Sequence, residues 1–276
     1  MSEKLSEEQI ASYHRNGFLS PVDVLSVQEA AEFRAKLEAA EKKWPEAFSG
    51  SGRNNAHCNF TFLDEIVHHP VLLDAVEDMI GPDILVCATV LFIKEANDPG
   101  FVSWHQDGKY MGLDPNEGVT AWVALSDANE TSGCMEMIPG SHKGSMHDHN
   151  DTYGEQNILT RGQEVTDVDP AKAVATPLRA GQVSFHHQRV IHGSQPNRSN
   201  DRRIGFAIQS YITPDVKQTK GTTHVQLARG EDRFGNFESA PRPKSDMTPD
   251  DVAMRDHMNN LWSDILYHGA EKVGKY

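Results

Sequence analysis

The chain has 276 residues, of which 38% are hydrophobic and 24% charged, and this composition is typical of a globular protein. Its formal net charge of −14 excludes a general affinity for nucleic acids, because phosphate binding needs a basic surface. The longest apolar run, residues 84–93, is about half as long as a membrane-spanning helix, which excludes a membrane partner. Three isolated cysteines without a CxxC motif and a charged start without a signal-peptide pattern indicate a reduced, cytoplasmic protein, whose oligomeric state stays open.

Helical signals dominate the first 80 residues. Residues 6–9 and 26–29 each form a capping box, and each is followed by apolar residues at helical spacing. A third helical stretch, residues 70–79, ends at a Gly-Pro pair. The sequence therefore predicts a helical N-terminal part, residues 1–82.

The pattern changes at Asp83, after which short apolar runs alternate with turn residues. Such runs predict an antiparallel barrel or sandwich, and residues 140–180 are expected to form loops. The tail is expected to be helical from about Pro249. No linker interrupts the chain, so we predict a single domain of residues 1–276 with a core at 83–215 and a C-terminal helical tail at 240–276. The expected strands are residues 84–93, 119–125, 182–191 and 203–212.

A histidine and a carboxylate stand two residues apart in Trp104-His105-Gln106-Asp107. On an extended chain, residues i and i+2 point to the same side, so His105 and Asp107 can bind one metal together. A distant second histidine would complete a two-histidine, one-carboxylate triad, which leaves open positions on Fe(II).

This spacing is not specific by itself, because chance predicts about one such pair in a chain of this composition. The second pair is His149 and Asp151. His105 follows a predicted strand and a Pro-Gly turn, whereas His149 lies in a polar stretch without strand signals. The context therefore favours His105.

Three histidines, His186, His187 and His192, compete to be the second histidine ligand. His192 stands at the end of an apolar strand, just before Gly193. A strand end suits a metal ligand, because rigid strand backbone there borders the open end of the fold. We expect His186 and His187 either to form the wall of the site or to support the metal ligands without binding the metal.

Arg203 begins the next predicted strand, eleven residues after His192. Small residues follow it on one face, a pattern that suits a pocket with an arginine at its base. A guanidinium group binds a carboxylate through two hydrogen bonds. His187 and Arg198 are also eleven residues apart, so the spacing alone does not select Arg203. The alternative for Arg203 is an ordinary surface ion pair, and the face of small residues favours the pocket.

Four ordered motifs, together with the opening LSEEQIASYHRNGFL, resemble the phytanoyl-CoA dioxygenase family over about residues 5–270. That family consists of Fe(II)- and 2-oxoglutarate-dependent oxygenases. The resemblance implies a mainly β fold with flanking helices around a double-stranded β-helix, a jelly-roll or cupin-like core. The motifs read WHQD, TAWVAL, SGCMEMIPGSHKGS and HGSQPNRSNDRRIGFAI.

The resemblance also implies the site. The iron ligands it implies are His105, Asp107 and His192, with no further catalytic residue. Halogenating relatives carry Ala or Gly at the carboxylate position, so Asp107 implies hydroxylation, with O2 and 2-oxoglutarate consumed and succinate and CO2 released. The residues it implies around 2-oxoglutarate are Arg203, Ser194, Trp122 and Gln106, with Lys94 as a weaker candidate.

The substrate is expected to be a small polar molecule, because polar donors dominate the predicted lid. Donors of this kind suit an anion, and an aminophosphonate is one candidate, since residues 160–163 and 229–233 resemble segments of aminophosphonate hydroxylases. The candidate substrate residues are Arg53, Asn55, His57, Tyr110, Asn157 and Arg161.

Three alternatives stay open. The first is an acyl-CoA or natural-product hydroxylase of the same family, and the second is a non-catalytic metal-binding barrel. The third is a zinc hydrolase built on His142, His147 and His149, although no helix-borne glutamate base stands beside these histidines.

Overall fold

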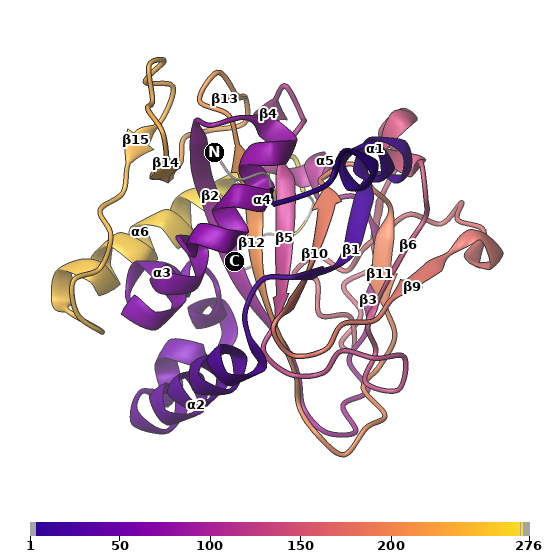
Figure 1. Cartoon of the computed structure of the whole chain (residues 1–276), viewed down its shortest axis with the longest axis horizontal. Coiled ribbons are helices and arrows are strands. Elements are labelled where there is room, and N and C mark those ends of the chain that lie inside the picture. The colour runs from indigo at the N-terminus through magenta and orange to yellow at the C-terminus, as the bar shows by residue number, and fades with distance from the viewer. Residues whose placement is uncertain (1–3, 271, 273–276) are drawn as a thin grey trace.

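The computed structural model describes residues 4–270 and residue 272, and in this part of the chain two sheets form the core. One is seven-stranded, in the order β1-β10-β5-β12-β2-β14-β15, and the other is four-stranded, in the order β3-β11-β6-β9. Figure 1 shows the strands of the four-stranded sheet at one side of the molecule and helices α2, α3 and α6 at the other. The predicted mainly β fold with a jelly-roll core is confirmed, and the sheets do not form a closed barrel.

The bounds of the elements are as follows. The helices are α1 (Glu7–Asn16), α2 (Val27–Lys43), α3 (Thr61–Val67), α4 (Pro70–Ile80), α5 (Gly108–Met111) and α6 (Pro249–Leu266). The strands of the large sheet are β1 (Phe18–Asp23), β2 (Ile84–Lys94), β5 (Val119–Ala124), β10 (Gln182–His187), β12 (Arg203–Ile212), β14 (His224–Arg229) and β15 (Glu238–Ser239). Those of the small sheet are β3 (Val102–His105), β6 (Met135–Met137), β9 (Val174–Thr176) and β11 (His192–Ser194). Two-stranded pairs are formed by β4 (Leu113–Asp114) with β13 (Lys217–Gln218) and by β7 (Asn150–Asp151) with β8 (Gln163–Glu164).

The central strands of the large sheet are buried on both faces, which explains their long apolar runs. On β5, Ala121 and Val123 pack in the core that the N-terminal helices share, whereas Trp122 and Ala124 belong to the core between the two sheets. Alternation along a strand sends neighbouring side chains to opposite faces. The inner face can therefore carry polar site residues, while the outward side chains Ala121 and Val123 stay in an apolar core.

The N-terminal part differs from its prediction in one respect, since it contains strand β1 as well as helices. β1 pairs with β10 at the edge of the large sheet, and the pairing is irregular between Leu19 and Val22. Pro21 lies in this interval, and proline is tolerated on edge strands. The proline interrupts the short apolar alternation, so the sequence shows no clear strand signal. Both predicted capping boxes, at Ser6 and at Ser26, are present.

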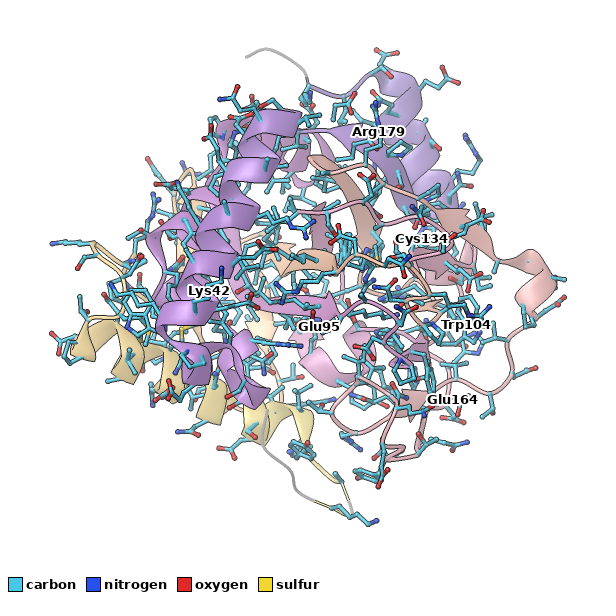
Figure 2. All side chains as sticks on the ribbon, turned by 90° about the horizontal axis from the view of Figure 1, so that it is seen from below. Lys42, Glu95, Trp104, Cys134, Glu164 and Arg179 are labelled. Carbon is cyan, nitrogen blue, oxygen red and sulfur yellow. The ribbon has the colours of Figure 1, made fainter. Side chains whose placement is uncertain are left out.

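The predicted strand over residues 182–191 is confirmed only as far as His187, because the chain then crosses from one sheet to the other. β10 ends at His187 in the large sheet, and β11 begins at His192 in the small sheet. The expected loop at 140–180 also contains β9, which pairs with β6. In Figure 2 the strand bearing Trp104 lies on the side of the molecule away from the helix bearing Lys42.

Two further predictions concerned the cysteines and membrane-spanning segments. All three cysteines are buried free thiols. None of the helices in the described part of the chain combines the length and the apolar character that crossing a bilayer needs. That residues 1–276 form a single domain stays a prediction.

Candidate active site

The two sheets bring His105, Asp107 and His192 together. His105 ends β3 and pairs with His192, the first residue of β11, so that the two ring centroids lie 4.2 Å apart. Asp107 Oδ1 lies 3.2 Å from His105 Nε2 and 3.9 Å from His192 Nε2. One possible ligand atom from each residue falls within 4.8 Å of the others, and each residue is at most 8% exposed.

Backbone carbonyls fix the orientation of both imidazoles. His105 Nδ1 lies 2.9 Å from Ser103 O, and His192 Nδ1 lies 3.0 Å from Val190 O. Because a carbonyl only accepts hydrogen bonds, each Nδ1 must carry the proton and donate it. The unprotonated Nε2 atoms are then free to bind a metal at the shared point.

The charges of the three groups also suit a metal. Burial lowers the pKa of His192 well below its ordinary value, and the neighbouring His105 and His186 rings lower it further. Burial alone would raise the pKa of Asp107, but the contacts with His105 and His186 bring it well below its usual range. Metal binding needs neutral imidazoles and an ionised carboxylate. Within residues 4–270 and 272, this is the one group of three such residues close enough to share an ion.

A small pocket beside this group ends at Arg203, which is 1% exposed. The guanidinium donates from Nη1 to Gly133 O at 3.2 Å and lies over the Trp122 ring at 5.2 Å. Its Nε is buried and has no hydrogen-bond partner in the described chain. Burial lowers the pKa of Arg203 to about 10, so the group keeps its charge at neutral pH. A buried cation with an unpartnered donor fits a carboxylate ligand.

Packing against Trp122 explains why a small residue follows Arg203 on this face of β12. A Cβ on Gly205 would lie 1.7 Å from Cζ2 of Trp122, so the indole ring needs glycine at this position. Trp122 itself lines the pocket together with Ser194. The pocket floor is therefore shaped by a ring packed directly on strand backbone.

Lys94 lies opposite Arg203 on the neighbouring strand β2 but is not among the residues that line the pocket. Its Nζ donates to Ser194 Oγ at 2.7 Å and to Gln195 O at 2.5 Å. Burial lowers the pKa of Lys94 to about 6, and the nearby Arg203 contributes to this shift.

Gln106 does not line the pocket, in contrast to what the resemblance implies. Its side chain accepts from His147 N at 2.9 Å and donates to Arg189 O at 2.7 Å. These two backbone groups, from different loops, satisfy both ends of its amide, and Gln106 is not among the residues that line the pocket. Gln106 thus holds the loop around His147 against the core.

The second His-x-Asp pair does not form a metal site. His149 Nε2 accepts from Gln106 N at 3.0 Å, and Asp151 accepts from Arg161 Nε at 2.9 Å. Burial lowers the pKa of His149 to about 4. The zinc alternative likewise lacks a site, because the described His142, His147 and His149 form no group that could share an ion.

A larger cavity of about 330 Å³ adjoins the triad, and His105 and Asp107 are among its lining residues. Aliphatic and aromatic side chains from β2, α5, the loop before β8 and helix α6 form much of its wall. The main apolar residues are Val90, Phe92, Met111, Leu159, Trp262 and Leu266. Besides His105 and Asp107, the polar side chains are those of Ser51, Arg53, Asn54, Tyr110, Thr160, Gln163 and Gln209.

Of the six candidate substrate residues, only Arg53 and Tyr110 line this cavity. The other four, Asn55, His57, Asn157 and Arg161, are buried in contacts within the protein. Their partners lie elsewhere in the chain. Asn55 donates to Asn259, His57 contacts Thr89, Asn157 donates to Ser103, and Arg161 binds Asp151 and the Leu266 carbonyl.

The sequence analysis missed the contribution of helix α6, whose Trp262 and Leu266 line the cavity. Their spacing of four residues indicates a buried face, but nothing in it distinguishes a cavity wall from core. Gln209 was also missed as a lining residue, although its strand face was identified. It touches both the cavity and the smaller pocket.

Comparison with known proteins agrees with this geometry. The model of the phytanoyl-CoA dioxygenase (PhyH) family matches residues 13–205. A protein of Stutzerimonas stutzeri named "probable alpha-ketoglutarate-dependent hypophosphite dioxygenase" is 31% identical over 187 residues, which is 67% of this chain and 62% of that protein. The peroxisomal phytanoyl-CoA dioxygenase of Rattus norvegicus is 28% identical over 84% of this chain and 77% of its own length.

Solved structures agree as well. The apo structure of the non-heme monooxygenase ThoJ matches with a TM-score of 0.84 and 33% identity, over 94% of this chain and 98% of that one. The structure of CytC3 with Fe(II) and alpha-ketoglutarate matches with a TM-score of 0.67 over 87% of this chain and 94% of that one. Since its identity is 20%, it supports the fold alone.

Proposed function

The chain belongs to the phytanoyl-CoA dioxygenase family, and on that premise we propose that it hydroxylates a small anionic molecule. It is an Fe(II)- and 2-oxoglutarate-dependent dioxygenase, as the resemblance in its motifs predicted. Its cosubstrates are 2-oxoglutarate and O2.

We assign His105, Asp107 and His192 as the iron ligands. The assignment is supported by the convergence of their ligand atoms and by the carbonyl contacts that leave both Nε2 atoms unprotonated. Bound Fe(II) supplies the centre at which O2 and 2-oxoglutarate react, so that a substrate C–H bond is oxidised and succinate and CO2 leave. The protein binds both organic molecules, orients them and excludes water.

We assign Arg203 as the clamp for the distal carboxylate of 2-oxoglutarate, with Ser194, Lys94 and Trp122 beside it. The unpartnered Nε of Arg203 supports this, because a buried guanidinium with a free donor needs an anionic partner. Gln209 touches both the pocket and the cavity, so the two molecules would lie end to end across the triad.

The single observation that supports the substrate class is the position of Arg53 on the cavity wall. It is the only Lys or Arg among the described residues that line the cavity. Among the same described lining residues the one carboxylate is that of Asp107, which we assign to the metal. A cation without an opposing free carboxylate favours an anionic substrate group, such as a carboxylate or a phosphonate. The relative named for hypophosphite dioxygenation fits a phosphorus oxyanion.

The size of the cavity limits the rest of the substrate. Ligand pockets span about 300–1,000 Å³, and this one, at about 330 Å³, is at the small end. Polar donors were expected to dominate the lid, and the cavity wall also includes apolar surface from Phe92, Trp262 and Leu266. The cavity therefore suits a compact anion that carries a short hydrocarbon part, rather than a long acyl chain.

A substrate panel tests this proposal. Enzyme loaded with Fe(II) is incubated with 2-oxoglutarate and with aminophosphonates, hypophosphite, amino acids or acyl-CoAs. Succinate and a product heavier by one oxygen atom are measured. We expect coupled turnover with a small anion and a raised KM for that anion in Arg53→Gln. The matched control is Arg15→Gln, since Arg15 is exposed on α1. Turnover of acyl-CoA with no small anion accepted would refute the proposal, and so would an unchanged KM in Arg53→Gln.

A further inference from the structure

We propose that His186 is a positioning residue of the metal centre, which holds one oxygen of Asp107 so that the other faces the ion. The proposal rests on the assignment of Asp107 as an iron ligand. His186 lies on β10, pairs with Thr120 of β5 and is 1% exposed. Its ring centroid lies 4.5 Å from that of His192.

The two oxygens of Asp107 have different surroundings. Oδ1 faces His105 Nε2 at 3.2 Å and His192 Nε2 at 3.9 Å. Oδ2 accepts from Thr120 Oγ1 at 3.3 Å and lies 3.6 Å from His186 Nε2. Oδ1 is therefore the atom nearer the shared ligand point, and Oδ2 is turned toward β5 and β10. A carboxylate that binds a metal through one oxygen is oriented by hydrogen bonds to its other oxygen.

The ring of His186 needs a partner. Both of its ring nitrogens are buried, and neither has a hydrogen-bond partner in the described part of the chain. Buried polar groups without partners are rare, because they lose their bonds to water. Asp107 Oδ2 lies only slightly beyond hydrogen-bond distance of Nε2, so a small movement of the carboxylate would satisfy the imidazole N–H.

The neighbouring histidine has no such role. His187 points to the opposite face of β10, where its Nε2 lies 3.0 Å from Glu117. Alternation along the strand thus separates two adjacent histidines into one that reaches Asp107 and one that does not. This gives a matched control on the same strand.

Loss of a partner that orients a metal ligand typically costs about 10–100-fold in metal affinity. Apo-protein is titrated without oxygen with Fe(II) alone and with Co(II) alone, and the Co(II) absorption bands report the ligand geometry. We expect His186→Phe to weaken Co(II) binding by about 10–100-fold and to change these bands. His186→Gln keeps an amide donor and should recover part of the affinity. His187→Gln should match the wild type.

A second variant guards against misfolding of His186→Phe. Thr120→Val removes the other donor to Asp107 Oδ2 at nearly constant volume, and it should also weaken metal binding. Wild-type affinity and bands in His186→Phe would overturn the inference. If His186→Phe does not fold, His186→Leu, which also lacks a donor, takes its place, and wild-type affinity and bands in that variant would overturn the inference. Failure of the iron assignment is distinguishable, because Asp107→Ala would then bind Co(II) as the wild type does.

Discussion

Lys94 and Arg203 face each other across strands β2 and β12, so two buried basic side chains lie side by side, and Arg203 lines the pocket. No carboxylate in the described chain lies within ion-pair distance of either one, although Lys94 hydrogen-bonds Ser194 and Gln195. Burial lowers both pKa values, that of Lys94 to about 6 and that of Arg203 to about 10. With a pKa of about 6, Lys94 is largely uncharged at neutral pH beside the charged Arg203, and an anion bound next to them would stabilise its protonated form.

Arg203→Lys is expected to raise the KM for 2-oxoglutarate about tenfold or more. Lysine cannot make the bidentate contact, and a charge-assisted contact of this kind is worth roughly 1.5–3 kcal/mol. The KM for the primary substrate should change much less. Succinate formation at varied 2-oxoglutarate measures the effect. Arg198→Lys is the control because Arg198 is exposed, and the same phenotype there with none in Arg203→Lys would contradict the assignment.

Asp107→Ala is expected to lose most bound iron and turnover, because it removes the only carboxylate of the triad. Iron per chain after anaerobic loading and desalting is the measurement. Asp151→Ala should keep its iron, since Asp151 binds Arg161 rather than a metal. Full iron occupancy in Asp107→Ala, or loss of iron in a folded Asp151→Ala protein, would show that the wrong pair had been chosen.

Trp262→Ala is expected to lower the free energy of unfolding by about 3–5 kcal/mol, the usual cost of truncating a buried aromatic residue. Trp262 is 1% exposed and packs in the core between α6 and β2, where it also lines the substrate cavity. Urea unfolding measures the loss. Phe234→Ala is the control, because Phe234 is 62% exposed and should change stability by less than about 0.5 kcal/mol. Equal effects of the two substitutions would contradict the packing described for α6.

Stability is expected to fall as the pH drops from about 6.5 toward 3, in part because of His57. Burial lowers the pKa of folded His57 from 6.5 to about 3, so the unfolded chain binds the extra proton throughout this window. One such group contributes at most about 1.4 kcal/mol per pH unit. His57→Gln should therefore flatten the dependence of the unfolding free energy on pH, even if its absolute stability is lower. The exposed His14 provides the control, and an equal flattening in His14→Gln would argue against this origin.

Local sequence was sufficient to predict a structural feature wherever the residues that determine it lie within a few positions of one another. The capping boxes at Ser6 and Ser26 predicted two helices, and the apolar run in β2 predicted a buried strand. The spacing of His105 and Asp107 likewise lets them converge without help from distant parts of the chain. The ordered motifs predicted the family, which the family model confirms.

Tertiary structure alone decided what depends on distant partners. The crossing between β10 and β11 carries His192 to the small sheet opposite His105 and leaves His186 on the large sheet, and no local pattern marks that crossing. Likewise, Asn55 and His57 were expected to reach the substrate, but Asn259 and Thr89 satisfy them inside the protein. A loop rich in polar residues has the same composition whether its side chains face solvent, a ligand or other parts of the chain. Only the folded contacts distinguish these cases, because hydrogen-bond partners far apart in sequence leave no periodic signal.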